Sequence, residues 1–134
     1  MIQNISYIII SDGVYKDNED NLIIHKPLNH IEVNELPTRT SFELTIGLIN
    51  LRRETIYDID VTIFEPGGHR IVSEGYSIQM SDKIKTDIGY VTINTKIHDI
   101  SLPSDGTYKI FVSMSPTGDE KIMCFTVCQG SGTK

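Results

Sequence analysis

The sequence predicts an all-β protein, an antiparallel β-sandwich of about seven to nine strands. Apolar and polar residues alternate with a period of two along most of its 134 residues. Gly, Pro, Asn and Asp interrupt this alternation at short intervals, as turns between strands do. No segment shows the 3.6-residue apolar period of a crossover helix, which disfavours parallel α/β folds. A single open sheet would leave many apolar side chains in water, so two packed sheets are expected.

Length and composition indicate one globular domain. The chain is 39% hydrophobic and 22% charged, which is ordinary for a folded protein of this size. The sequence predicts a single β-sandwich domain over residues 1–128. Residues 129–134 are rich in Gly and Ser, and we expect them to form a flexible C-terminal tail.

The charge balance excludes some classes of partner. Lys and Arg number 12 against 18 Asp and Glu, giving a net charge of −6, so nucleic acid and anionic membrane surfaces are not expected partners. Met1–Asn4 carries no positive charge, and the apolar run Ile5–Ile10 is too short for a secretory signal or a membrane span. These features predict a cytoplasmic protein that does not bind membranes.

The first third of the chain predicts three strands. Asn4–Ile10 is apolar at almost every position, as expected for a strand that is covered on both faces or lies in an interface. The polar stretch Ser11–Asn21 predicts a long loop. Leu22–His25 and Ile31–Val33 predict two short strands, and Pro27 between them favours a sheet edge or a bend.

The middle of the chain has the clearest alternation. Ser41–Leu48 predicts a strand, and so does the segment before the Glu65–Gly68 turn, whose glycines suit a tight hairpin. The inward residues of these two strands are expected to be Phe42, Leu44, Ile46, Leu48, Tyr57, Ile59, Val61 and Ile63. A further strand over Arg70–Ser73 should follow, whereas Ser77–Asp87 is weakly patterned and predicts an exposed loop or a short helix.

The last third predicts three more strands. Gly89–Ile97 is the first of these, and a hairpin at Pro116–Asp119 precedes the last, Lys121–Val127. The penultimate strand is expected to bury Tyr108, Ile110, Val112 and Met114. Cys124 and Cys128 lie four residues apart in the last strand, about 13 Å between Cα atoms, which is beyond disulfide reach. We therefore expect free thiols, and no zinc site because further ligands at short spacing are missing.

The segment Leu102–Tyr108, before an alternating strand, resembles the approach to the penultimate strand of immunoglobulin-like domains. In those domains a tyrosine early in the strand bonds back to the backbone of the corner. The usual Asp-x-Gly-x-Tyr spacing is one residue shorter here, and the Cys and Trp hallmarks of antibody domains are absent. The resemblance implies an immunoglobulin-like sandwich.

The order of features from residue 5 to residue 128 is also similar to a family of bacterial and phage proteins grouped as a domain of unknown function. The matching features are Ser11-Asp12 after the first strand, Leu22-Ile23-Ile24, Pro37, the Pro66-Gly67-Gly68 turn and Leu102–Tyr108. This resemblance implies a small β-sandwich, with no activity and no site residues to carry over.

Two groups of side chains have the chemistry of metal ligands. Asp12, Asp17, Glu19 and Asp20 are a candidate calcium site, although they lack the ordered spacing of an EF-hand. His25, His30 and Glu32 are a second group, because His30 and Glu32 share one face of a strand. In both cases a solvated surface is the simpler interpretation.

No arrangement for catalysis or cofactor binding is found. His98 and Asp99 are adjacent, but neighbouring strand residues point to opposite faces and are poorly placed to pair. The Gly-rich segments lack the Lys and the strand-to-helix context of a phosphate loop. The sequence predicts a protein that is not an enzyme and needs no cofactor.

One predicted outer face is unexpectedly apolar. If Tyr108 and its alternating neighbours face the core, Phe111 faces outward and meets Ile122 and Cys124 of the last strand. These three residues predict a protein–protein interface, either with a partner or by self-association. The alternative is that Ser77–Asp87 covers them. The sequence thus favours a non-catalytic protein-interaction module, with a ligand- or calcium-binding sandwich as the alternative.

Overall fold

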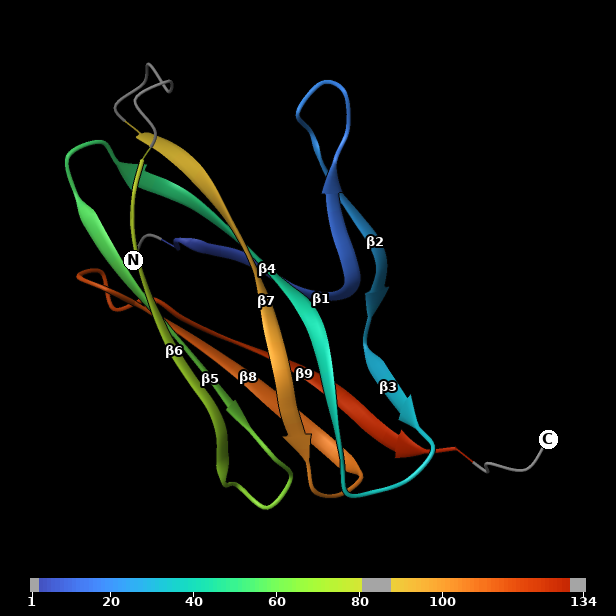
Figure 1. The fold of residues 1–134 in the computed structure, drawn as a ribbon. Helices are drawn as coiled ribbons and strands as arrows, with labels where there is room; N and C mark the ends of the chain where they lie inside the picture. Colours follow the sequence, from blue (N-terminus) through green and yellow to red (C-terminus); the bar gives the residue numbers. More distant parts are fainter. Residues whose placement is uncertain (1–2, 81–87, 131–134) are drawn as a thin grey trace.

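The predicted β-sandwich is confirmed. The computed structural model describes residues 3–80 and 88–130, which form nine strands and contain no helix. One sheet has the strand order β2-β1-β4-β7 and the other β3-β9-β8-β5-β6 (Figure 1). The four-stranded sheet consists of β1 (Ile5–Lys16), β2 (Leu22–Leu28), β4 (Thr38–Arg52) and β7 (Ile88–Leu102). The five-stranded sheet consists of β3 (His30–Val33), β5 (Ile56–Phe64), β6 (Arg70–Gln79), β8 (Gly106–Ser115) and β9 (Glu120–Gln129).

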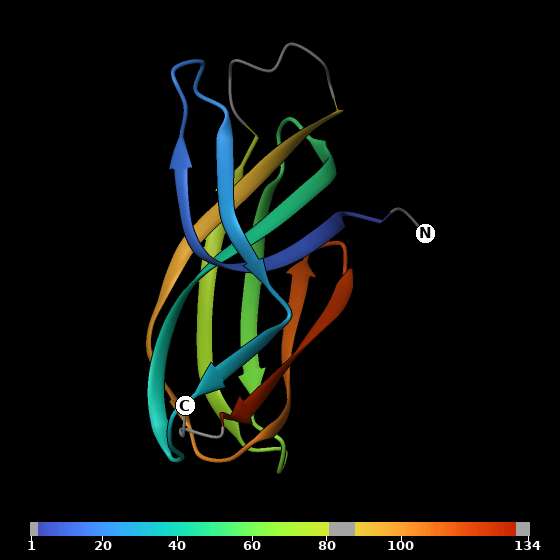
Figure 2. The same cartoon turned by 90° about the vertical axis from the view of Figure 1, so that its right-hand side faces the viewer.

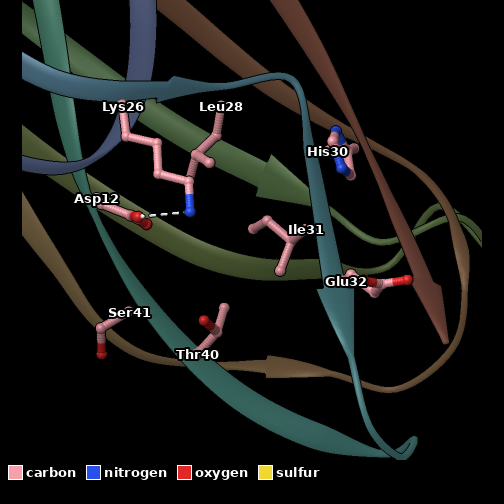
Figure 3. Close-up of a pocket in the computed structure, with 8 residues that line it drawn as sticks. All are labelled: Asp12, Lys26, Leu28, His30, Ile31, Glu32, Thr40 and Ser41. Carbon is pink, nitrogen blue, oxygen red and sulfur yellow. Dashed lines mark ion pairs between the residues drawn. The ribbon is translucent and has the colours of Figure 1, made fainter. Parts of the chain in front are cut away.

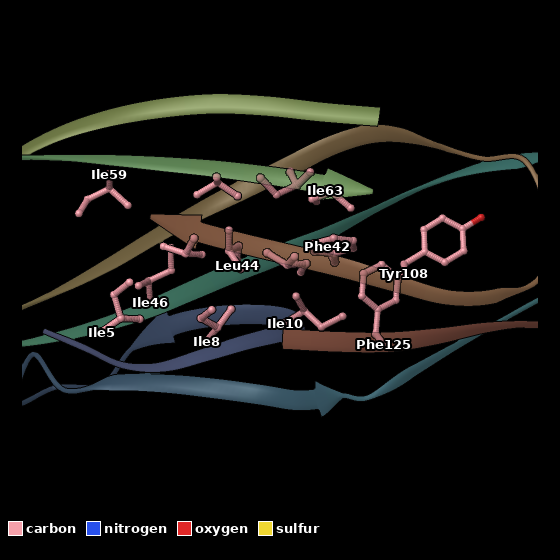
Figure 4. Close-up of a cluster of buried hydrophobic side chains, with 14 of the residues drawn as sticks. Ile5, Ile8, Ile10, Phe42, Leu44, Ile46, Ile59, Ile63, Tyr108 and Phe125 are labelled. Carbon is pink, nitrogen blue, oxygen red and sulfur yellow. The ribbon is translucent and has the colours of Figure 1, made fainter. Parts of the chain in front are cut away.

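The core lies between the two sheets and uses the predicted inward faces. Phe42, Leu44, Ile46 and Leu48 of β4 are buried, as are Tyr57, Ile59, Val61 and Ile63 of β5 and Tyr108, Ile110, Val112 and Met114 of β8. Figure 4 shows side chains from both sheets meeting in this layer. At one end, the Phe125 ring stacks on Tyr108 with centroids 5.4 Å apart and meets the edge of Phe42 at 5.8 Å.

Tyr108 closes the corner between β7 and β8. Its hydroxyl donates a hydrogen bond to the carbonyl of Ser104 at 2.6 Å, and Gly106 supplies the positive φ of 126° that the turn requires. The ring itself is fully buried. The structure therefore contains a bond from this tyrosine to the corner backbone, although the turn is one residue shorter than the usual one.

Replacing Tyr108 with Phe should lower the free energy of unfolding by about 1–2 kcal/mol, because the Ser104 carbonyl loses its donor while the ring packing is kept. Chemical denaturation of the variant and the parent measures the difference. Tyr15→Phe is the matched control, since the Tyr15 side chain is 57% exposed. An equal effect of the two substitutions would show that the corner bond contributes nothing to stability.

Several strands are longer than the sequence indicated, and in β1, β6 and β9 the extra length replaces a predicted loop or tail. The loop predicted over Ser11–Asn21 is wrong up to Lys16, because β1 continues there and pairs with β2 from Ser11↔Pro27 to Lys16↔Leu22. β6 extends to Gln79, so the loop or helix predicted from Ser77 is wrong over its first residues, and residues 81–87 lie outside the described part. β9 includes Gln129, which pairs with Val33, whereas tail residues 131–134 are not described.

The chain crosses from one sheet to the other between β2 and β3. β3 then pairs with β9 in parallel, from His30↔Thr126 to Val33↔Gln129, which makes the five-stranded sheet mixed. An all-antiparallel sandwich was expected, so this pair is a departure from the prediction. Figure 2 shows β3 beside only the C-terminal end of β9.

Candidate functional site

The predicted apolar surface exists on the outer face of the five-stranded sheet. Because Ile110 and Val112 point into the core, the intervening Phe111 points outward. Phe111 lies directly opposite Ile122 on β9 and opposite Thr62 on β5. We call this row, Thr62, Phe111 and Ile122, the outer stripe. Ile122 is 54% exposed and Phe111 is half-buried.

Cys124 lies beside the outer stripe on β9. It is exposed and pairs with Lys109 of β8, one row along from Ile122. Glu120 lies one row along in the other direction, opposite Ser113. The structure therefore brings the three predicted interface residues together, and it places Lys109 and Glu120 on opposite sides of the Phe111–Ile122 row.

The edge of β9 beside the outer stripe carries no paired strand in the described residues, and we call it the open edge; β1 of the other sheet comes close to β9. The N–H of Thr126 donates to the carbonyl of Asn29 at 3.1 Å, so the even-numbered residues of β9 direct their backbone groups away from β8. Ile122 and Cys124 share this direction, but β3 pairs with β9 only from Thr126 onward. Within the described residues, no strand pairs with Ile122 or Cys124 on that side.

The predicted calcium ligands do not form one cluster. Asp17, Glu19 and Asp20 lie in the short turn between β1 and β2. The Asp17 carboxylate accepts the N–H groups of Glu19 and Asn21, each at 2.9 Å, and the bond from Asn21 is the main cause of its lowered pKa. Asp20 pairs with Lys16 at 3.5 Å. The Asp17 carboxylate thus acts as a turn cap.

Asp12 lies apart from that turn. It belongs to β1, and its carboxylate pairs with the Lys26 ammonium at 3.6 Å. Asp12 and Asp17 are five positions apart, which in an extended strand corresponds to roughly 16 Å. In residues 3–80 and 88–130 there is no group of three or more His, Cys, Asp or Glu side chains placed to hold a metal ion.

A pocket of about 460 Å³ lies beside the crossing from β2 to β3 (Figure 3). It is lined by Asp12, Lys26, Leu28, His30, Ile31, Glu32, Thr40 and Ser41. Figure 3 shows the Asp12–Lys26 ion pair on one side, with Glu32 pointing away from that pair. The His30 ring contacts the Asn29 side chain at 3.0 Å. His25 lies in the β1–β2 hairpin opposite Gly13 and does not line this pocket.

Asp99, a candidate for catalysis in the sequence, has structural partners. Asp99 pairs with Arg39 at 3.7 Å, and its N–H donates to the Ser41 hydroxyl at 2.8 Å. Both contacts tie β7 to β4, and neither involves His98. Cys124 and Cys128 are free thiols, in agreement with the sequence.

The apolar outer face is predictable from the sequence, whereas the open edge of β9 is not. The alternation in β8 and β9 was enough to place Phe111, Ile122 and Cys124 on one surface. The edge depends on the length and position of β3, which pairs with residues about 95 positions away in the sequence. No local pattern carries that information.

No helix in the described ranges has the length and apolar character that crossing a membrane requires.

Comparisons with known proteins give a family but no function. The model of a family of unknown function (DUF6941) matches residues 6–122. No curated protein matches the chain. Two similar solved structures are crystal structures of β-glucosidase from Listeria innocua, one of them in complex with glucose. The first, with glucose, is 11% identical, with a TM-score of 0.47, and the match covers 90% of this chain and 16% of that one.

The second β-glucosidase structure is 12% identical, with a TM-score of 0.47 and 92% of this chain covered. The chain spans 16% of the length of each of these structures. Their activity is not transferred to it.

Proposed function

The chain belongs to this family of unknown function, and we propose that it is a non-catalytic protein-interaction module that associates with a second copy of itself through the outer stripe. The observation that carries the proposal is the contiguity of Phe111 and Ile122. A single exposed apolar residue is common, but these two are direct cross-strand neighbours, and Ile122 is 54% exposed. Burial of this pair against a second molecule removes apolar area from water.

The charges around the outer stripe favour a second copy as the partner. Lys109 lies one row to one side of Phe111 and Ile122, and Glu120 lies one row to the other side. A two-fold axis through the stripe therefore brings the lysine of each copy toward the glutamate of the other. The surface is self-complementary, as an interface between identical molecules with two-fold symmetry must be.

The absence of a catalytic role and the cytoplasmic location are part of the same proposal. The Asp99 carboxylate pairs with Arg39 instead of His98, which supports a structural role for it. The exposed thiol of Cys124 suits a reducing compartment. The corner bond from Tyr108 to Ser104 supports an immunoglobulin-like form of the sandwich.

Phe111→Asp tests the proposal. The substitution removes the apolar ring from the outer stripe and puts a carboxylate beside Ile122, which should weaken self-association at least about tenfold, a cost of about 1.4 kcal/mol or more. Sedimentation velocity over a concentration series measures this, and circular dichroism checks that the variant is folded.

Thr92→Asp is the matched control for Phe111→Asp. It adds the same charge at an exposed position of β7, in the other sheet, and should associate like the parent. A Phe111→Asp variant that is folded and associates as tightly as the parent would rule the outer stripe out as the interface.

A further inference from the structure

We infer that the second copy joins edge to edge through β9, antiparallel and with the two-fold axis at Ile122, so that two five-stranded sheets become one continuous sheet. This inference rests on the proposed function, because it names how the outer stripe meets its partner. It distinguishes edge pairing from the other arrangement, in which two outer faces stack on each other.

The open edge of β9 supplies the hydrogen-bonding groups for this pairing. The backbone N–H and C=O of Ile122 and Cys124 point to the side on which β3 has already ended. Unpaired edge groups next to an apolar face are a template for another strand. A strand added there lies end to end with β3, so the pairing is limited to the part of β9 before Thr126.

The register follows from the groups that are free to pair. With the axis at Ile122, the Ile122 residues of the two copies exchange hydrogen bonds, and Cys124 faces Glu120 of the second copy. The Glu120 backbone groups, like those of Ile122 and Cys124, point away from β8. The Cys124 N–H then donates to the Glu120 carbonyl of the second copy. In a register centred one residue earlier, the Lys121 residues of the two copies face each other, and the repulsion between their like charges disfavours that register.

Side chains are complementary in this register. The outer stripe becomes continuous across the axis, with Ile122 against Ile122 of the second copy and Phe111 on each flank. In the next row across the continuous sheet, Lys109 of β8, Cys124 of β9 and Glu120 of the second copy lie side by side. Lys109 and this glutamate are then two strands apart, about 9.6 Å between backbones, which their long side chains span.

Cys124→Pro tests the edge directly. Proline removes the N–H that bonds to the second copy, and it is tolerated where an edge N–H faces solvent. The outer stripe keeps Phe111 and Ile122. We expect the proline variant to remain folded by circular dichroism and to associate at least tenfold more weakly than Cys124→Ser. Proline and serine variants that associate equally well would overturn edge pairing.

Cross-linking gives a second test that does not depend on proline being accepted. In a chain with Cys124→Ser and Cys128→Ser, Ile122→Cys places two thiols opposite each other across the axis. Directly opposite, hydrogen-bonded residues have Cα atoms about 5.5 Å apart, which is within disulfide range. Oxidation with copper phenanthroline should produce a covalent dimer of twice 15.1 kDa.

Thr126→Cys in the same chain is the control, because β3 covers the edge at Thr126 and no cross-link is expected. If the parent dimerises, Phe111→Asp breaks the dimer and Ile122→Cys does not cross-link, edge pairing is wrong while the proposed function stands. If the parent is monomeric at every concentration, both are wrong.

Discussion

Phe125→Ala is expected to lower the free energy of unfolding by about 3–5 kcal/mol, a large part of the stability of a typical domain. Phe125 is 1% exposed and contacts two other aromatic rings, Phe42 and Tyr108. These rings come from β4 and β8, so Phe125 joins the two sheets at one end of the core. Its removal leaves a cavity that the flanking strands cannot collapse to fill, because both are held in hydrogen-bonded ladders.

Urea denaturation measures this loss as a lower midpoint with an unchanged slope. Phe64→Ala is the matched control, because Phe64 is only half-buried and points to the outer face beside Lys109. We expect it to lose much less stability than Phe125→Ala. Similar losses in the two variants would contradict the assignment of Phe125 to the core and Phe64 to the surface.

Asp119→Ala should lower the free energy of unfolding by about 2–4 kcal/mol, because hydrogen bonds between a charged carboxylate and buried N–H groups are lost. The Asp119 carboxylate accepts the backbone N–H groups of Asn4 and Ile5, each at 2.8 Å. Both residues are buried, so their N–H groups have little access to water in exchange. Asp119 thereby ties the start of β1 to the β8–β9 hairpin, and thermal denaturation of parent and variant measures its contribution.

The contribution of Asp119 should also depend on pH. Burial raises the pKa of this carboxyl, but the N–H groups of Ile5 and Asn4 outweigh it and hold the pKa below 3.8. A pKa lower in the folded than in the unfolded state stabilises the fold above about pH 3.9. That stabilisation is lost as the pH falls through the folded pKa.

Asp119→Asn has nearly the same shape but no charge to lose. The difference in free energy of unfolding between this variant and the parent should therefore be largest near pH 7 and shrink below pH 3.8. Denaturation curves at a series of pH values measure this. A deficit that stays constant down to pH 2 would contradict the role of the ionised carboxylate.

The sequence predicted the parts of the fold that depend on local pattern. The inward face of β4 over Ser41–Leu48 and the turn at Glu65–Gly68 follow from alternation and from glycine, and both are confirmed. Pro27 was expected at a sheet edge, and β2 is the edge strand of its sheet. In each case the information lies within a few neighbouring residues.

Contacts between distant residues were not predictable in this way. The second half of β1 is polar because it forms an exposed hairpin with β2, and polarity alone was interpreted as a loop. The parallel pairing of β3 with β9 joins segments about 100 residues apart, and so do the hydrogen bonds that the N–H groups of Asn4 and Ile5 donate to Asp119. Alternation identifies which face of a strand is buried, but it does not identify which strands are neighbours.

The same distinction between local pattern and distant contacts applies to the candidate site. Phe111, Ile122 and Cys124 were predicted to share a surface, and they do, because one register between neighbouring strands is enough to align them. The calcium ligands were grouped by their closeness in sequence. Because β1 is extended between them, Asp12 lies far from Asp17. The Asp12 carboxylate pairs with Lys26, and the Asp17 carboxylate accepts the N–H of Asn21.

The solution mass of the unmodified protein, measured by light scattering coupled to size exclusion across a concentration series, tests self-association most directly. Self-association through the outer stripe predicts a mass that rises toward twice 15.1 kDa as the concentration increases. A mass that stays at 15.1 kDa at every concentration would contradict it.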